Sequence, residues 1–145
     1  MFYDDATTNA KESNWATSNL SVSYNNGRVV SNSSGSNVFH RILDNGSLKT
    51  FDTPIIIEFD IIEFSGSIVT VTDGTNQVRQ GLGAIGVTSN NTIRIKYDGT
   101  TAKYYVDGVY KPSADITASN SSVTVGFRLS NDASITYKNI KVYPI

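Results

Sequence analysis

Planar hydrogen-bonding side chains gather in the middle of the chain, on segments that are typical of short strands. Glu58 and Asp60 are separated by one residue, and so are Gln77 and Arg79. Because side chains alternate between the two faces of a strand, the members of each pair point the same way. Carboxylates accept hydrogen bonds and guanidinium groups donate them, so such a face can bind a ligand rich in hydroxyl groups. The residues predicted to share this outer face are Glu58, Asp60, Thr70, Thr72, Gln77 and Arg79.

Four more side chains could border a binding face: His40, Arg41, Tyr105 and Arg128. His40 and Arg41 are consecutive, so their side chains leave opposite faces of a strand, and a structural role is the alternative for His40. Tyr105 points away from its neighbours and could stack on a sugar ring. Since the chain has one histidine and no cysteine, it offers no His- or Cys-based metal site and no Ser-His triad. The loops at 32–37, 73–76 and 113–121 are further candidate contact sites.

The stretch 92–111 gives the strongest structural signal. Two runs of alternating apolar and polar residues flank Asp98-Gly99, and a second Asp-Gly pair follows at Asp107-Gly108. Asp-Gly between alternating runs predicts a β-hairpin, because glycine supplies the positive φ that the reversal requires. Antiparallel strands are therefore expected here, with Ile93, Ile95 and Tyr97 facing inward.

Other alternating segments extend this pattern to an all-β fold. Segment 54–64 is the longest expected strand, and a meander over 67–80 follows it. About ten strands with turns at regular intervals predict a two-sheet antiparallel sandwich, expected as a single domain over 1–145. Residues expected to face the interior of the sandwich include Ile55, Ile57, Phe59, Ile61, Val69, Val71, Val78, Val123, Val125, Phe127 and Leu129.

Composition excludes several classes of function. Ser, Thr and Asn make up roughly a third of the chain, and these residues favour strands and turns over helices. The net charge is −1 with acidic and basic residues interspersed, so nothing draws the chain to nucleic acid. No apolar run reaches the length of a membrane span, so no insertion into a membrane is expected.

Three stretches resemble the concanavalin A-like lectin/glucanase superfamily of jelly rolls. Residues 2–5 (FYDD) with Asn14-Trp15 are similar to the opening strand of carbohydrate-associated modules, and residues 93–108 resemble the hairpin of laminin G-like and family 16 glycoside hydrolase domains. Residues 137–144 (YKNIKVYP) look like their final strand, which commonly lies beside the first. The resemblance implies a concanavalin A-like jelly-roll β-sandwich and binding of carbohydrate.

Two features depart from these relatives. Many of them bind a structural calcium ion through an Asp in the last strand, where this chain has Lys138-Asn139; calcium is therefore an open alternative through Asp4 and Asp5. Glu58, Asp60 and Glu63 match the Glu-x-Asp-x-x-Glu spacing of retaining family 16 glycosidases. In a regular strand Glu63 points away from the other two, so only a bulge near 61–62 would unite them.

These observations favour a non-catalytic carbohydrate-binding, lectin-like module of a larger cell-surface or phage tail receptor-binding protein. Its partner would be a polysaccharide or glycoconjugate, and its setting extracellular, on a cell surface or a virion, with adhesion as its role. The alternatives are a minimal retaining β-glycosidase that uses Glu58 and Glu63, and a structural spacer or oligomerisation sandwich in a fibre.

Overall fold

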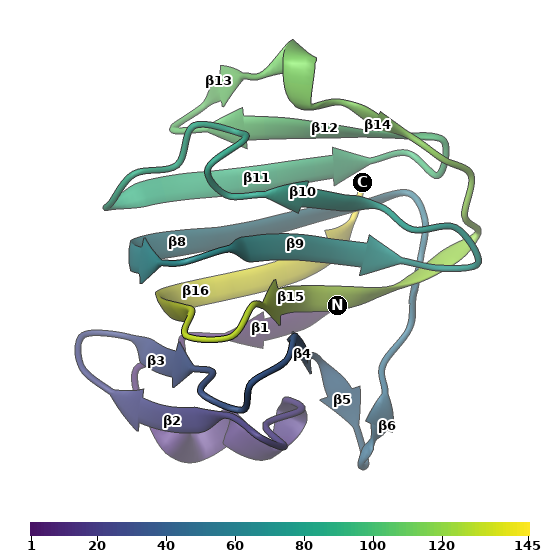
Figure 1. Cartoon of the computed structure of the whole chain (residues 1–145). Coiled ribbons are helices and arrows are strands. Elements are labelled where there is room, and N and C mark those ends of the chain that lie inside the picture. The colour runs from purple at the N-terminus through teal and green to yellow at the C-terminus, as the bar shows by residue number, and fades with distance from the viewer.

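Two antiparallel sheets packed face to face account for most of the chain in the computed structural model, which describes residues 1–145 (Figure 1). In the large sheet the strand order is β13-β12-β11-β8-β16-β3-β2, with β1 beside β16 and β14 beside β12. Its strands are β1 (Phe2–Asp4), β2 (Ser21–Tyr24), β3 (Arg28–Ser31), β8 (Ile55–Ser65), β11 (Asn91–Tyr97), β12 (Thr101–Val106), β13 (Val109–Tyr110), β14 (Ile116–Thr117) and β16 (Ser134–Pro144).

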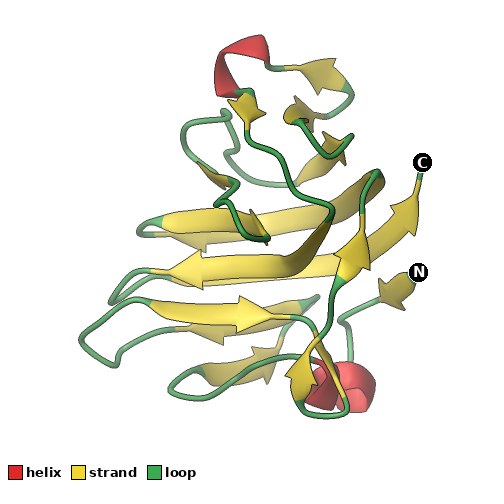
Figure 2. Cartoon of the chain, turned by 90° about the vertical axis from the view of Figure 1, so that its right-hand side faces the viewer, coloured by secondary structure: helices red, strands yellow, loops and turns green.

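The small sheet lies in front of the large one in Figure 1, with the order β10-β9-β15-β4 and β7 beside β15. Two short 3-10 helices lie at opposite ends of the molecule (Figure 2). No helix has the length and hydrophobicity needed to cross a bilayer. The remaining elements are β4 (Val38–Arg41), β7 (Phe51–Asp52), β9 (Ile68–Asp73), β10 (Arg79–Gly81), β15 (Ser122–Leu129), the β5–β6 hairpin (Leu43–Asp44 and Ser47–Leu48), and the helices η1 (Asn9–Asn14) and η2 (Pro112–Ala114).

The predicted hairpin is formed by β11 and β12, with Ile95 opposite Tyr104. The Asp98 carboxylate closes its turn by accepting hydrogen bonds from the backbone N–H groups of Thr101 and Thr100, each at 2.8 Å. These bonds favour the charged carboxylate and lower the pKa of Asp98. The first and last strands also pair as predicted, since β1 lies beside β16.

Apolar side chains from both sheets fill the space between them. The inward faces predicted for β8, β11 and β15 are confirmed, because Ile57, Ile95 and Phe127 are all buried. Phe59 and Phe127 meet edge to face with ring centroids 5.2 Å apart. Each such side chain contributes about 1.5–3 kcal/mol when fully buried, so this layer is the main source of stability.

The orientation predicted for β9 is wrong. Thr70 and Thr72, expected on the outer face, point into the sandwich, while Val69 and Val71 lie on the outer side with Asp73. The two inward hydroxyls are satisfied locally, since Thr70 Oγ1 donates to the carbonyl of Gln80 at 3.1 Å and Thr72 Oγ1 to that of Val78 at 3.2 Å. Val and Thr are both β-branched and fit either face of a strand, so alternation alone could not fix the orientation.

Asp4 anchors a buried polar cluster at one end of the sandwich. Its Oδ2 accepts a hydrogen bond from Arg28 Nη1 at 2.7 Å and one from Trp15 Nε1 at 2.9 Å, and its Oδ1 accepts one from the backbone N–H of Ala6 at 2.8 Å. Both carboxylate oxygens are thus engaged by protein donors. Asp4 pairs with the Arg28 guanidinium, and no group of three or more His, Cys, Asp or Glu side chains is placed to hold a metal ion.

The cluster continues to His40 through Tyr137. Arg28 Nη1 donates to the Tyr137 hydroxyl at 3.0 Å, and that hydroxyl lies 2.7 Å from His40 Nε2. His40 Nδ1 lies 2.9 Å from the carbonyl oxygen of Ala16, which can only accept, so Nδ1 carries the proton and Nε2 accepts from Tyr137. The His40 ring also stacks on Trp15, with centroids 4.6 Å apart. The N-terminal segment is therefore joined to strands of both sheets.

We expect Gly126→Ala to destabilise the fold by about 1–3 kcal/mol. A Cβ atom at Gly126 would lie 2.2 Å from the carbonyl oxygen of His40 and 2.6 Å from the Cα of Arg41, so β4 would have to move away from β15. The free energy of unfolding in urea measures the effect. Gly83→Ala is the matched control, because a Cβ there meets nothing within 4 Å. Equal stability of the two variants would contradict the prediction.

Candidate functional site

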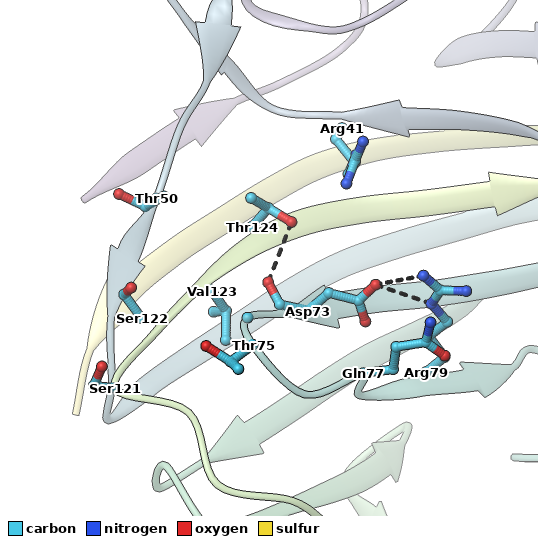
Figure 3. A pocket seen from close by; sticks show the side chains of 11 residues that line it. Arg41, Thr50, Asp73, Thr75, Gln77, Arg79, Ser121, Ser122, Val123 and Thr124 are labelled. Atoms are coloured by element: carbon cyan, nitrogen blue, oxygen red, sulfur yellow. Dashed lines mark hydrogen bonds and ion pairs between the residues drawn. The ribbon is translucent and has the colours of Figure 1, made fainter.

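A polar depression of about 480 Å³ lies on the outer face of the small sheet (Figure 3). Only one of the 11 residues that line it is hydrophobic, and two arginines and one aspartate are its charged members. A site so lined is suited to a ligand rich in hydrogen-bonding groups. The lining residues are Arg41, Thr50, Asp73, Gly74, Thr75, Gln77, Arg79, Ser121, Ser122, Val123 and Thr124.

Strand register places Arg41 and Arg79 on the same face of the small sheet. Arg79 on β10 pairs with Val71 on β9, Val71 pairs with Gly126 on β15, and Gly126 pairs with Arg41 on β4. The four residues form one row across the sheet, with a long side chain at each end. Gly126 has no side chain, and the Arg41 side chain packs over it, with Cγ 3.0 Å from where a Cβ would lie.

Asp73 holds Arg79 in place at one side of the depression. Its Oδ2 accepts hydrogen bonds from Arg79 Nε at 2.9 Å and Nη2 at 2.7 Å, and its Oδ1 accepts one from the backbone N–H of Val78 at 2.9 Å. The pair is shielded from water, with 21 % of the Arg79 side chain and 10 % of the Asp73 side chain exposed. Charge-assisted bonds in such a setting fix the geometry of both groups.

Arg41 has no such partner. Its guanidinium forms no ion pair and no hydrogen bond, and its Nε is buried without a partner. It packs instead on the ring of Phe39, with the guanidinium carbon 4.5 Å from the centroid, and the Arg79 guanidinium lies 5.1 Å from the same centroid. The positive charge of Arg41 is therefore directed at the depression without compensation by the protein.

The hydroxyl and amide groups around the depression are equally unengaged. The side chains of Thr50, Thr75, Gln77, Ser121 and Ser122 line it and form no hydrogen bond within the protein. Only Thr124 does so, donating weakly to the carbonyl of Asp73 at 3.3 Å. Together with Arg41, these groups form a set of donors and acceptors that a ligand can use.

Three of the predicted site residues come together here: Arg41, Gln77 and Arg79. Arg128 lies on the same outer face, on β15 opposite Phe39 and Val69, but does not line the depression. The loop predicted at 73–76 contributes as well. Thr50, Ser122 and Thr124 were not predicted, and nothing in their sequence surroundings marked them as part of a site.

Glu58, Asp60 and Tyr105 lie elsewhere, so the prediction that Glu58 and Asp60 share a face with Gln77 and Arg79 is wrong. The two acids are on β8 of the large sheet and face away from the small one, and Tyr105 on the same side packs against Tyr110. The reason is that β8 and β9, although consecutive, belong to different sheets: the chain crosses from one layer to the other at 65–67 instead of forming a hairpin.

His40 is fully buried, and both ring nitrogens are hydrogen-bonded. Burial lowers the pKa of His40 to about 4, because the charged imidazolium is disfavoured away from water. His40 therefore has a structural role, and the prediction that it contacts a ligand is wrong. Its neighbour Arg41 leaves the opposite face of β4, as alternation predicted.

The three spaced acids do not share a cleft. A register shift between β16 and β8 leaves Ile62 as an extra residue, so the strand does have the bulge that could unite them. Glu58, however, is bound by Arg94 at 3.0 Å and by the Tyr143 hydroxyl, and Asp60 accepts from Thr92 at 2.9 Å and from Asn139 at 2.9 Å. Glu58, Asp60 and Glu63 line three different depressions.

Comparison with known proteins shows the fold. No protein-family model matches the sequence, and no curated protein matches it either. A protein of unknown function with a galectin-like fold from Bacillus subtilis superposes with a TM-score of 0.70 at 10 % identity, covering 99 % of this chain and 94 % of that one.

Two further solved structures share the arrangement. The carbohydrate-binding module CBM66 from Bacillus subtilis has a TM-score of 0.60 at 15 % identity, with 89 % of this chain and 94 % of that chain covered. A candidate glycosyl hydrolase from Parabacteroides distasonis has a TM-score of 0.62 at 11 % identity, and both chains are covered completely, at 100 %. These similarities confirm the predicted fold, a two-sheet antiparallel jelly-roll β-sandwich.

Proposed function

We propose that this chain is a non-catalytic carbohydrate-binding module that holds a glycan in the depression on the small sheet. The observation that carries the proposal is the set of unengaged polar side chains around the depression, from Arg41 across to Gln77. Sugars present many hydroxyl groups, each able to donate and accept, and such a lining can satisfy several of them at once. The fold is shared with a module whose name states that it binds carbohydrate.

The positions of the carboxylate side chains support a role in binding rather than in catalysis. Retaining hydrolysis needs two carboxyl groups about 5–5.5 Å apart on one sugar. The depression contains a single carboxylate, Asp73, which is already engaged by Arg79 and by the backbone N–H of Val78. Glu58 and Glu63 line separate depressions away from it.

We place the module in a larger surface protein, such as a phage tail or cell-surface adhesin, outside the cell. A shallow polar site of this kind makes few contacts with its ligand, so each copy would bind weakly. Several copies on one particle or cell would raise the overall affinity by multivalency.

The decisive experiment is a glycan array with a blocking variant. Thr75 is exposed at the mouth of the depression, so Thr75→Trp should fill it and weaken binding by at least about tenfold while leaving the fold intact. The control is Lys96→Trp, at an exposed position on the outer face of the large sheet. Folded wild-type protein that binds no glycan, or binding that Thr75→Trp leaves unchanged, would refute the proposal.

A further inference from the structure

We propose that the depression selects glycans that carry an anionic substituent, and that Arg41 is the residue that binds this group. The inference rests on the proposed function and names the class of ligand. A uronic acid carboxylate, a sulfate ester and a phosphate diester share the required chemistry of a compact anion on a sugar.

The first step is the charge balance of the lining. Arg79 is neutralised by Asp73 through two hydrogen bonds. Arg41 has no acidic partner, and neither has Arg128, which lies farther along the same face. No other acidic side chain lines the depression. The site therefore carries excess positive charge, which a neutral sugar would leave unpaired.

The second step is the position of the Arg41 guanidinium. Its packing against Phe39 at 4.5 Å and the burial of Nε restrict the side chain to one place. The terminal nitrogens form no hydrogen bond within the protein, yet, unlike Nε, they are not buried. They are the part of the group that a ligand can reach, and Figure 3 shows Arg41 across the depression from Gln77.

The third step is the match between this group and an anion. A guanidinium is planar and presents two parallel N–H donors, which fit the two oxygens of a carboxylate or of a sulfate or phosphate group. Because the guanidinium is already fixed by packing, little conformational entropy is lost on binding. The hydroxyl and amide groups of Thr75 and Gln77 are then available for the neutral part of the sugar.

The test uses matched pairs of polysaccharides in affinity electrophoresis and calorimetry. Polygalacturonate, alginate and hyaluronan are each compared with their carboxyl-reduced forms, dextran sulfate with dextran, and a glycan carrying phosphodiester side groups with its dephosphorylated form. We expect binding of at least one anionic member to be roughly 10- to 100-fold tighter than that of its neutral counterpart, the range of one charge-assisted hydrogen-bonded contact. The pair that responds identifies the anion.

Three variants assign the effect to Arg41. Arg41→Gln should abolish the preference for the anionic form, and Arg41→Lys should keep only part of it, because an ammonium group lacks the planar pair of donors. Lys96→Gln changes the net charge equally on the outer face of the large sheet and should leave the preference intact. Circular dichroism confirms that each variant is folded.

The possible results distinguish failure of the anion preference from failure of carbohydrate binding itself. If the wild-type protein binds neutral and anionic members of every pair equally, or if Arg41→Gln and Lys96→Gln lower the preference alike, the inference is overturned while carbohydrate binding stands. If no glycan is bound at all, the proposed function fails, and the inference fails with it.

Discussion

Replacement of Asp4 by Asn is expected to lower the free energy of unfolding by about 3–5 kcal/mol. The Arg28 side chain is 0 % exposed and that of Asp4 is 2 % exposed, so the variant would leave a guanidinium charge inside the protein with no counter-charge. The same carboxylate oxygen accepts from Trp15 Nε1, and that bond would weaken as well. Urea-induced unfolding followed by Trp15 fluorescence measures the loss.

Two further variants identify the cause. Asp5→Asn removes the same charge from the neighbouring residue, which is exposed, and should change stability by less than about 0.5 kcal/mol. The double variant Asp4→Asn with Arg28→Met removes both charges and should be more stable than Asp4→Asn alone, because no unpaired charge is then buried. A double variant that is less stable than Asp4→Asn alone would show that packing, not the ion pair, governs this region.

The sandwich could be predicted because its signals are local. Asp98-Gly99 between two alternating runs is a strong local signal for a hairpin, and the long apolar face of residues 55–61 requires a partner layer. The alternation of apolar and polar residues does not predict which of the two sheets a strand joins. The crossing at 65–67 moves β9 to the other sheet, and for that reason Glu58 and Arg79 are on opposite sides of the molecule.

For the same reason, individual residues of the site were predicted from the sequence, but not that they lie together. Arg41, Gln77 and Arg79 were identified as polar residues on outer faces, but their convergence depends on the row that runs through Val71 and Gly126. Such a row joins residues up to 85 positions apart, as from Arg41 to Gly126, and no sequence spacing encodes it. The burial of His40 likewise depends on Tyr137, a residue of the last strand.

Acid is expected to destabilise the protein through His40, by about 3 kcal/mol in total. The pKa of His40 is about 4 in the folded protein, against about 6.5 when the chain is unfolded, because burial disfavours the imidazolium. Between pH 6.5 and 4 the unfolded chain therefore binds more protons than the folded one. The contribution of His40 to stability is complete above pH 6.5 and is lost as the pH falls toward 4.

The surroundings of His40 make this loss difficult to avoid. Protonation would add a hydrogen at Nε2, directed at the Tyr137 hydroxyl. Burial raises the pKa of Tyr137, so this hydroxyl keeps its own hydrogen. It also already accepts a hydrogen bond from Arg28. The positive charge of Arg28 opposes a charged imidazole, and Asp4, the nearby acid, is paired with Arg28.

Urea unfolding at a series of pH values from 7 to 4 measures this slope, and His40→Gln tests its origin. Because the chain has a single histidine, the variant should be less stable at pH 7 yet lose far less stability on acidification. The carboxylates of Asp98 and Asp107, whose pKa values are lowered by hydrogen bonds from backbone N–H groups, lose their contribution only as the pH falls through and below 3.8, outside most of this window. Parallel pH profiles for the variant and the wild-type protein would show that His40 is accessible to protons in the folded state, which contradicts its placement between the two sheets.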